Sequence, residues 1–236
     1  MSDRSESPPP ALDPDTLALL TQFIGEKTAQ QQRFDALTEA AAAEDAPTKY
    51  PSVDEYRATF AEDWQLSQFW YTTPFAERFA QLLHGLCDEN TSIAFLCCPT
   101  AWVAFQHLKP LDNAKLLEVD GRFGVLAPRN YIRYDMEEPL AIPEHLTNSV
   151  EIAVVDPPFL NEYTNERIVT TLRKIMRPNA KLIVLTSTSV ESILERLYDT
   201  PPLGPLRRTK VEVLHGQLRN DFGCWANWEG SEELKC

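Results

Sequence analysis

The stretch VEIAVVDPPF, residues 150–159, ends an apolar run with one carboxylate and a rigid turn. Its first six residues have the composition of a buried strand, and Pro157 and Pro158 must end that strand because proline has no N–H for the ladder. Asp156 then lies where the strand reaches solvent. There it can accept a hydrogen bond from a reacting amine, with the Pro157 carbonyl as a second acceptor and Phe159 as a flat apolar wall.

Acidic residues also end a second apolar run, KLLEVD at 115–120. Ligands of open α/β sheets bind outside the carboxyl ends of the strands, where one carboxylate can accept both hydrogen bonds from a ribose hydroxyl pair. Glu118 and Asp120 both fit this role, and the terminal Asp120 reaches further into the crevice. Asp-Pro-Pro alone suits an ordinary turn equally well. The second acid favours the interpretation of both strand ends as a binding site.

The first apolar run, Ile93–Cys98, is not followed by a phosphate-binding signature. No GxGxxG follows it, the chain contains no GxxxxGK motif, and only 8 of its 236 residues are glycine. These features disfavour a dinucleotide or a nucleoside triphosphate. They leave an adenosyl ligand without phosphates, for which a tight turn of small residues suffices, here Cys98, Pro99 and Thr100.

The sequence QFWY at 68–71 lies just before a predicted helix start at Thr73 and Pro74. Adjacent large aromatic residues beside a polar one can clamp an adenine ring. Phe69 and Trp70 are equally typical of a hydrophobic core, so the sequence leaves both interpretations open.

The elements that must position these residues follow an α/β pattern. Four apolar runs are predicted as strands, at Ile93–Cys98, Lys115–Asp120, Val150–Val155 and Lys181–Thr186. Helical patterns lie between some of them, at Ala101–Leu108, Asn165–Met176 and Val190–Leu197. This alternation predicts a mostly parallel sheet. Two later runs, Lys210–Leu214 and Phe222–Trp228, are predicted as an antiparallel hairpin at one edge.

The N-terminal part divides into three segments. Residues 1–12 are predicted to be a disordered tail. Residues 13–50 form a helical extension and linker, in which Asp13 caps a helix that continues to about Ala43. Residues 51–236 form the main domain, and a capping box at Ser52 and Glu55 predicts the start of its first helix.

Charge and cysteine content restrict the possible functions. The net charge is −13, and residues 1–92 hold 16 acidic and 6 basic residues, a net of −10. This front repels a polyanion and attracts a basic protein, although the same acids also serve solubility. The five cysteines are predicted to be reduced and mostly buried, and no spacing predicts a metal site. Because no signal peptide is recognisable, we expect a cytoplasmic protein.

Four stretches together resemble the eukaryotic N6-adenine methyltransferase-like family, which has a DPPF motif. They are QFWY at 68–71, IAFLCCPTA at 93–101, LLEVDGRFG at 116–124 and VVDPPF with the following NEYT at 154–164. Within that family the pattern is similar to the lysine methyltransferases of translation elongation factor 1-alpha. The resemblance covers roughly residues 50–230 and implies a seven-stranded, Rossmann-like sheet with S-adenosyl-L-methionine as cofactor.

The resemblance also implies roles for single residues. Residues 156–159 would hold the acceptor amine, and Asp120 would contact the cofactor together with the turn after the first strand. Trp70 and Tyr71 would lie near the same pocket. The chain departs from the pattern after the first strand, where Cys98-Pro99-Thr100 replaces the usual glycines.

Three functions follow as hypotheses. The first is a protein-lysine N-methyltransferase acting on elongation factor 1-alpha, most simply as a monomer. The second is an adenine-N6 methyltransferase on DNA or RNA, which is disfavoured because residues 93–236 carry 19 acids and 16 bases and so lack a basic excess. The third is a non-catalytic methyltransferase-like binding module, which is disfavoured because the acid at 156 is present.

Overall fold

The computed structural model describes residues 13–43, 50–218 and 221–236. The predicted tail of residues 1–12 and the part of the predicted linker at 44–49 lie outside these residues. Within them, no helix is long and apolar enough to cross a membrane.

Seven strands of the described chain form one sheet in the order β3-β2-β1-β4-β5-β7-β6. The strands are β1 (Ile93–Leu96), β2 (Ala114–Glu118), β3 (Tyr131–Arg133), β4 (Val150–Val155), β5 (Met176–Ser187), β6 (Arg207–Arg208) and β7 (Phe222–Ala226). Neighbours from β3 to β5 are parallel, whereas β7 runs antiparallel to both β5 and β6. The predicted mostly parallel sheet with antiparallel C-terminal strands is therefore confirmed.

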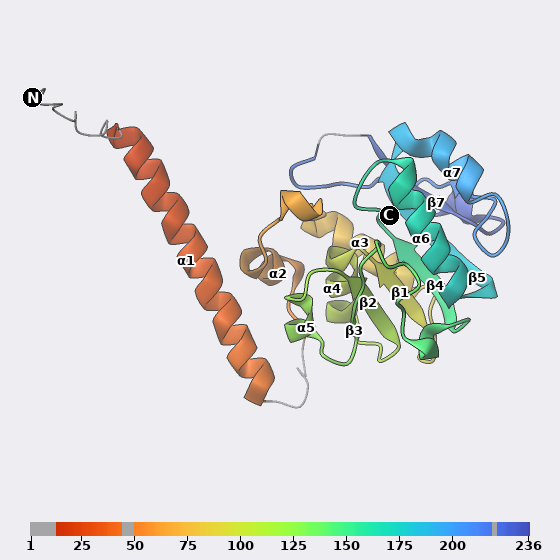
Figure 1. Ribbon diagram of the computed structural model, residues 1–236, viewed down its shortest axis with the longest axis horizontal. Coiled ribbons are helices and arrows are strands. Elements are labelled where there is room, and N and C mark those ends of the chain that lie inside the picture. The colour runs from red at the N-terminus through yellow and green to blue at the C-terminus, as the bar shows by residue number, and fades with distance from the viewer. Residues whose placement is uncertain (1–12, 44–49, 219–220) are drawn as a thin grey trace, which may run out of the picture.

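Helices lie on both faces of this sheet (Figure 1). The helices of the described chain are α2 (Val53–Thr59), α3 (Thr73–His84), α4 (Pro99–Leu108), α5 (Phe123–Leu126), α6 (Glu162–Ile175) and α7 (Glu191–Leu197), together with α1 (Pro14–Ala43), which stands away from the sheet (Figure 1). Short 3-10 turns occur at Trp64–Leu66, Glu144–Leu146, Thr188–Val190 and Ser231–Glu233.

Alternate strand residues supply two separate cores, as expected for strands buried on both faces. Phe95 and Val154 belong to the core that contains α3 and α4. Leu96 and Val155 belong to the core that contains α6 and α7. The sheet therefore holds the ends of β1 and β4 rigidly from both sides.

The first strand is shorter than predicted. It ends at Leu96 because Cys97 adopts a left-handed backbone with φ of 56° and Cys98 is the N-cap of α4. The two cysteines therefore lie in the turn after the strand, although both are apolar enough to continue it.

Of the two strands predicted for the C-terminal hairpin, the second is confirmed and the first is wrong. Phe222–Ala226 is a strand, but Lys210–Leu214 is not, and the partner of β7 is the two-residue strand Arg207–Arg208. Val211 and Val213 are buried in the core without entering the sheet. The alternation of these valines with polar residues resembles that of a strand, but here it arises because an extended loop packs its valines into the core.

The N-terminal helix begins as predicted and lies on the outside of the body (Figure 1). Asp13 accepts a hydrogen bond from the Thr16 amide at 3.0 Å, which caps the helix. Its later part contacts the main body, where Phe34 packs edge-on against Phe60 at 5.8 Å and Arg33 donates to the Ala58 carbonyl at 3.0 Å. These contacts join the later part of α1 to the segment that contains α2 and Phe60.

The predicted capping box at the start of α2 is confirmed. The Glu55 amide donates to the Ser52 hydroxyl, and the Glu55 carboxylate accepts from the Ser52 amide at 2.8 Å. Tyr56 on this helix is fully buried and packs against Phe60 and Trp70 at ring distances of 5.2 Å. Helix α2 therefore packs against the QFWY segment through the contact between Tyr56 and Trp70.

Candidate active site

The candidate site lies where the strand order reverses direction. The chain passes from β1 to β2 on one side, while β4 pairs with β1 on the other. The Asp156 amide donates to the Leu96 carbonyl at 3.1 Å, and the Cys97 amide donates to the Leu117 carbonyl at 3.0 Å. The residues after β1, β2 and β4 consequently meet at one edge, which is the usual ligand position in open α/β sheets.

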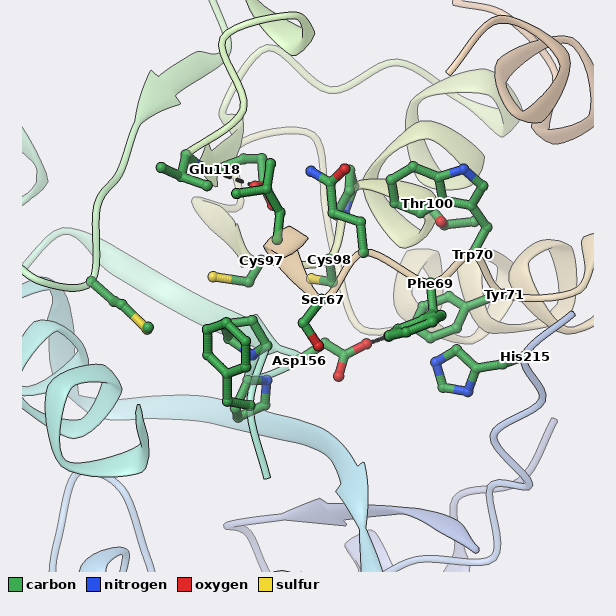
Figure 2. Close-up of a pocket in the computed structure, with 18 of the residues that line it drawn as sticks. Ser67, Phe69, Trp70, Tyr71, Cys97, Cys98, Thr100, Glu118, Asp156 and His215 are labelled. Carbon is green, nitrogen blue, oxygen red and sulfur yellow. Dashed lines mark hydrogen bonds between the residues drawn. The ribbon is translucent and has the colours of Figure 1, made fainter. Parts of the chain in front are cut away.

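A cavity opens at this edge (Figure 2). Ten of the eleven predicted site residues line it, namely Trp70, Tyr71, Cys98, Pro99, Thr100, Glu118, Asp156, Pro157, Pro158 and Phe159. Asp120 is the exception. The structure therefore brings the strand ends, the DPPF turn and the aromatic segment together around one space.

The Asp156 carboxylate is held by a residue far away in the sequence. The Tyr71 hydroxyl donates to Asp156 Oδ2 at 2.5 Å, as Figure 2 shows. Burial raises the pKa of Asp156 to about 7, the Tyr71 hydrogen bond opposes that rise, and the charge of Glu118 adds to it. Among the described residues, Asp156 Oδ1 has no hydrogen-bond partner, so this oxygen is available to a ligand.

The two adjacent aromatic residues differ in their surroundings. Trp70 is 3% exposed, and its indole N–H donates to the Phe60 carbonyl at 2.8 Å, so most of this side chain belongs to the core. Tyr71 instead reaches the acid of the DPPF turn. The segment thus serves both as core and as cavity wall, which the sequence could not separate.

Of the two acids near the end of β2, the structure turns Glu118 into the cavity. Its carboxylate accepts hydrogen bonds from the Val119 and Asp120 amides, and burial raises its pKa to about 7. Asp120 is bound by Arg122 at 2.6 Å and by the Gln68 amide group at 3.2 Å. Its terminal position on the strand favours Asp120 as the acid in the crevice, but the Arg122 guanidinium holds the Asp120 carboxylate outside the cavity lining.

The turn after β1 is built without the glycines usual at such turns. Cys98 lies at the N-cap and Pro99 begins α4, whose first residues are buried at the cavity. The Cys98 thiol donates to the Val154 carbonyl at 3.4 Å, which ties the turn to β4. The left-handed backbone at Cys97 supplies the sharp change of direction that a glycine would otherwise provide.

Several lining residues were not predicted from the sequence. Tyr134, Asp135 and Met136 follow β3, a strand too short and too exposed to be recognised. His215 comes from the loop after β6, and its backbone forms an antiparallel bridge with Tyr71. That loop carries no motif, so only the pairing of distant segments places it at the site.

The electrostatic character of the cavity is acidic. Glu118, Asp135 and Asp156 line it, and among the residues that the structure describes no lysine or arginine does. His215 is uncharged at neutral pH because burial lowers its pKa to about 4. The described lining therefore suits a cationic ligand and offers no positively charged side chain to a phosphate.

The chain is similar in sequence to named protein-lysine methyltransferases. The chain is 30% identical to Protein-lysine N-methyltransferase EFM5 of Saccharomyces cerevisiae, over 93% of this chain and 92% of that protein. It is 28% identical to EEF1A lysine methyltransferase 1 of Homo sapiens, over 97% of each. A solved structure, a predicted O-methyltransferase from Agrobacterium tumefaciens, aligns with a TM-score of 0.46 and 16% identity over 68% of this chain and 83% of that one.

A family model described as probable N6-adenine methyltransferase matches residues 62–230. The match spans the candidate site from the aromatic segment to the last strand of the sheet. The chain belongs to this methyltransferase family.

Proposed function

We propose that this protein is an S-adenosyl-L-methionine-dependent protein-lysine N-methyltransferase that acts on translation elongation factor 1-alpha. The observation that carries the proposal is the Asp156 carboxylate at the end of β4, with one oxygen held by Tyr71 and the other open to an acidic cavity. The names of the relatives in yeast and human support protein-lysine methylation, and the name of the human relative also supports this substrate. The proposal places the enzyme in the cytoplasm as a monomer.

The charge of the cavity favours a lysine over a nucleic-acid adenine. An adenine flipped out of DNA or RNA brings its flanking phosphates to the mouth of the site, where basic side chains normally receive them. The described lining supplies acids instead. A lysine side chain is a cation on an apolar stem, which matches an acidic cavity with the apolar wall of Phe159.

The same residues fit the cofactor. Glu118 is a buried acceptor at the end of β2, in the position that suits a ribose hydroxyl pair. The sulfonium and amino groups of S-adenosyl-L-methionine are cationic and the molecule carries no phosphate, which agrees with an acidic lining. When bound, it supplies an electrophilic methyl group.

The protein residues then prepare the acceptor. A lysine ammonium has a pKa of about 10.4 in water and must lose a proton before it can attack. Desolvation in the cavity lowers that pKa, whereas the acidic side chains of the lining oppose the change, and the proton leaves to water. Asp156 Oδ1 and the Pro157 carbonyl accept the remaining N–H groups and aim the nitrogen lone pair, while the two prolines keep the acceptors in place.

A transfer assay with tritiated S-adenosyl-L-methionine tests the proposal. Wild-type enzyme is offered purified elongation factor 1-alpha and, separately, DNA and RNA. We expect label in the protein and none in nucleic acid. Label in nucleic acid alone would favour the adenine reaction, and cofactor binding without any transfer would favour a binding module.

Variants of the turn connect that activity to the site. Asp156→Ala should lower the transfer rate about 10²–10³-fold with cofactor affinity nearly unchanged, because one oriented acceptor is lost from a water-poor site. The exposed Asp199, which lies outside the cavity lining, gives the matched control Asp199→Ala. A folded Asp156→Ala enzyme with near-normal turnover would contradict the role of the DPPF turn.

A further inference from the structure

We infer that Tyr71 is a positioning residue for the methyl-accepting amine, which it serves by fixing the Asp156 carboxylate, and that it is not primarily a cofactor contact. This inference rests on the proposed function and assigns a role within the same site. The family resemblance instead implies that Tyr71 lies near the cofactor pocket together with Trp70.

The geometry gives the two carboxylate oxygens different tasks. Tyr71 Oη lies 2.5 Å from Asp156 Oδ2, while Oδ1 has no partner among the described residues. Burial raises the pKa of the Tyr71 phenol well above its usual value, so the hydroxyl stays protonated and can only donate to the carboxylate. One oxygen is therefore locked and the other is presented to the substrate.

The Tyr71 ring is fixed independently of its hydroxyl. It packs edge-on against the Phe75 ring, with centroids 5.1 Å apart, and in a tilted arrangement against the His215 ring, with centroids 4.9 Å apart. Its backbone is bridged to His215, and the neighbouring Thr72 amide donates to the Leu214 carbonyl at 2.8 Å. Because these contacts do not involve the hydroxyl, Tyr71→Phe removes the hydrogen bond and leaves the ring in place.

The surroundings of Asp156 predict how its titration responds. Glu118 from β2 and the thiols of Cys97 and Cys98 interact with it, and Tyr71 supplies the hydrogen bond that lowers its pKa. Burial raises the pKa of both thiols, so they are neutral near pH 7. His215, behind the Tyr71 ring, is neutral as well because burial lowers its pKa to about 4. Loss of the Tyr71 hydroxyl must therefore raise the pKa of Asp156.

The experiment compares wild type, Tyr71→Phe and Tyr198→Phe. Tyr198 is the matched control because it is also a buried tyrosine whose hydroxyl donates to a side chain, Asn165 Oδ1 at 3.1 Å, outside the cavity lining. Measurements are cofactor Kd by calorimetry, kcat and KM for elongation factor 1-alpha from about pH 6 to about pH 9, and melting temperature.

For Tyr71→Phe we expect kcat to fall about 10- to 100-fold, with cofactor Kd changed less than about twofold. The acid limb of its pH–rate profile should move to higher pH, a shift that a purely structural loss would not cause. Tyr198→Phe should lower the melting temperature with normal kcat and an unmoved profile. Tyr71→Phe with wild-type kcat and profile would overturn the inference. A loss of cofactor affinity that accounts for the whole defect would return Tyr71 to the cofactor role.

A second measurement separates this inference from the proposed function. Carboxyl ¹³C NMR titration of Asp156 needs no substrate, and its pKa should be higher in Tyr71→Phe than in wild type. If wild type fails to methylate the elongation factor but this shift occurs, the proposed substrate is wrong and the Tyr71–Asp156 coupling stands. An unchanged Asp156 pKa would overturn the coupling itself.

Discussion

At the scale of single residues, the two acids near the end of β2 have exchanged the roles that their order in the sequence suggests. Reach along a strand favours the last acid, but Arg122 follows Asp120 by two residues and captures it at 2.6 Å. The Glu118 carboxylate lies in the cavity, where its burial raises its pKa to about 7. A short-range ion pair thus decides which acid faces the cavity.

This assignment predicts that Glu118→Gln weakens S-adenosyl-L-methionine binding about tenfold or more, because hydrogen bonds to a charged acceptor are the stronger ones. Asp120→Ala should affect melting temperature more than cofactor affinity, since it releases Arg122 and Gln68. Calorimetry and thermal melts on both variants give the comparison. Unchanged affinity in Glu118→Gln with a large loss in Asp120→Ala would restore the original choice.

Burial of the Asp156 carboxylate also predicts that its charged form lowers the stability of the folded protein. Its folded pKa of about 7 lies above the usual 3.8, so the native state prefers the protonated form. Its contribution to stability is full below about pH 4 and is lost as the pH rises through about 7. Asp156→Asn should therefore melt above wild type at about pH 8 by a few degrees, since 1 kcal/mol shifts a domain of this size by about 2–4 °C.

That stability difference should shrink as the pH falls towards about 4, where wild type is itself protonated. Thermal melts of both proteins across this range provide the test. A constant difference at all pH values would mean that the carboxylate is not the cause. The same variant should also methylate more slowly than wild type, because its amide presents an NH₂ or a neutral oxygen in place of the carboxylate.

Site residues next to strand ends could be predicted because their position depends on local sequence. Eight of the ten predicted residues at the cavity end or follow β1, β2 or β4, whereas Trp70 and Tyr71 precede α3 and were found through the family resemblance. The Tyr71–Asp156 hydrogen bond joins residues 85 positions apart, and the bridge to His215 is longer still. Such pairings depend on how the sheet and loops assemble, which a single sequence does not record.

At the scale of elements, apolar runs predicted the long central strands well. Val150–Val155 was predicted with its observed bounds, whereas β3 and β6 have only three and two residues and leave no periodic signal. The prediction of a strand at Lys210–Leu214 was wrong because the valines of this segment are buried in a loop. Central strands are determined by burial on both faces, and edge strands by the partners they meet.

The capping box of α2 allows a prediction at this scale. Ser52→Ala removes the acceptor for the Glu55 amide and should cost about 1 kcal/mol of unfolding free energy. Because Tyr56 on the same helix packs against Trp70, cofactor affinity should fall slightly as well. Urea denaturation measures the first effect. Stability equal to wild type would show that water replaces the cap without loss.

At the scale of the whole molecule, negative charge is concentrated towards the N-terminus, and the candidate cavity is acidic too. Residues 1–45 hold 9 acids and 3 bases, a net of −6 within the total of −13. Helix α1 carries part of this charge along the outside of the body, and only its later half is tied to the domain. A basic substrate would therefore meet a field of one sign from first approach to final binding.

Deletion of residues 1–45 should then raise KM for elongation factor 1-alpha several-fold at low salt, and the effect should shrink as screening increases. The deletion also uncovers Phe60, because Phe34 is lost with α1. Phe34→Ala is the matched control, since it removes that contact and leaves the charge. If KM responds to Phe34→Ala as strongly as to the deletion, packing rather than charge is responsible. A KM indifferent to both the deletion and the salt would mean that the N-terminal acids serve solubility alone, and the attraction of the substrate would then reside in the acidic cavity.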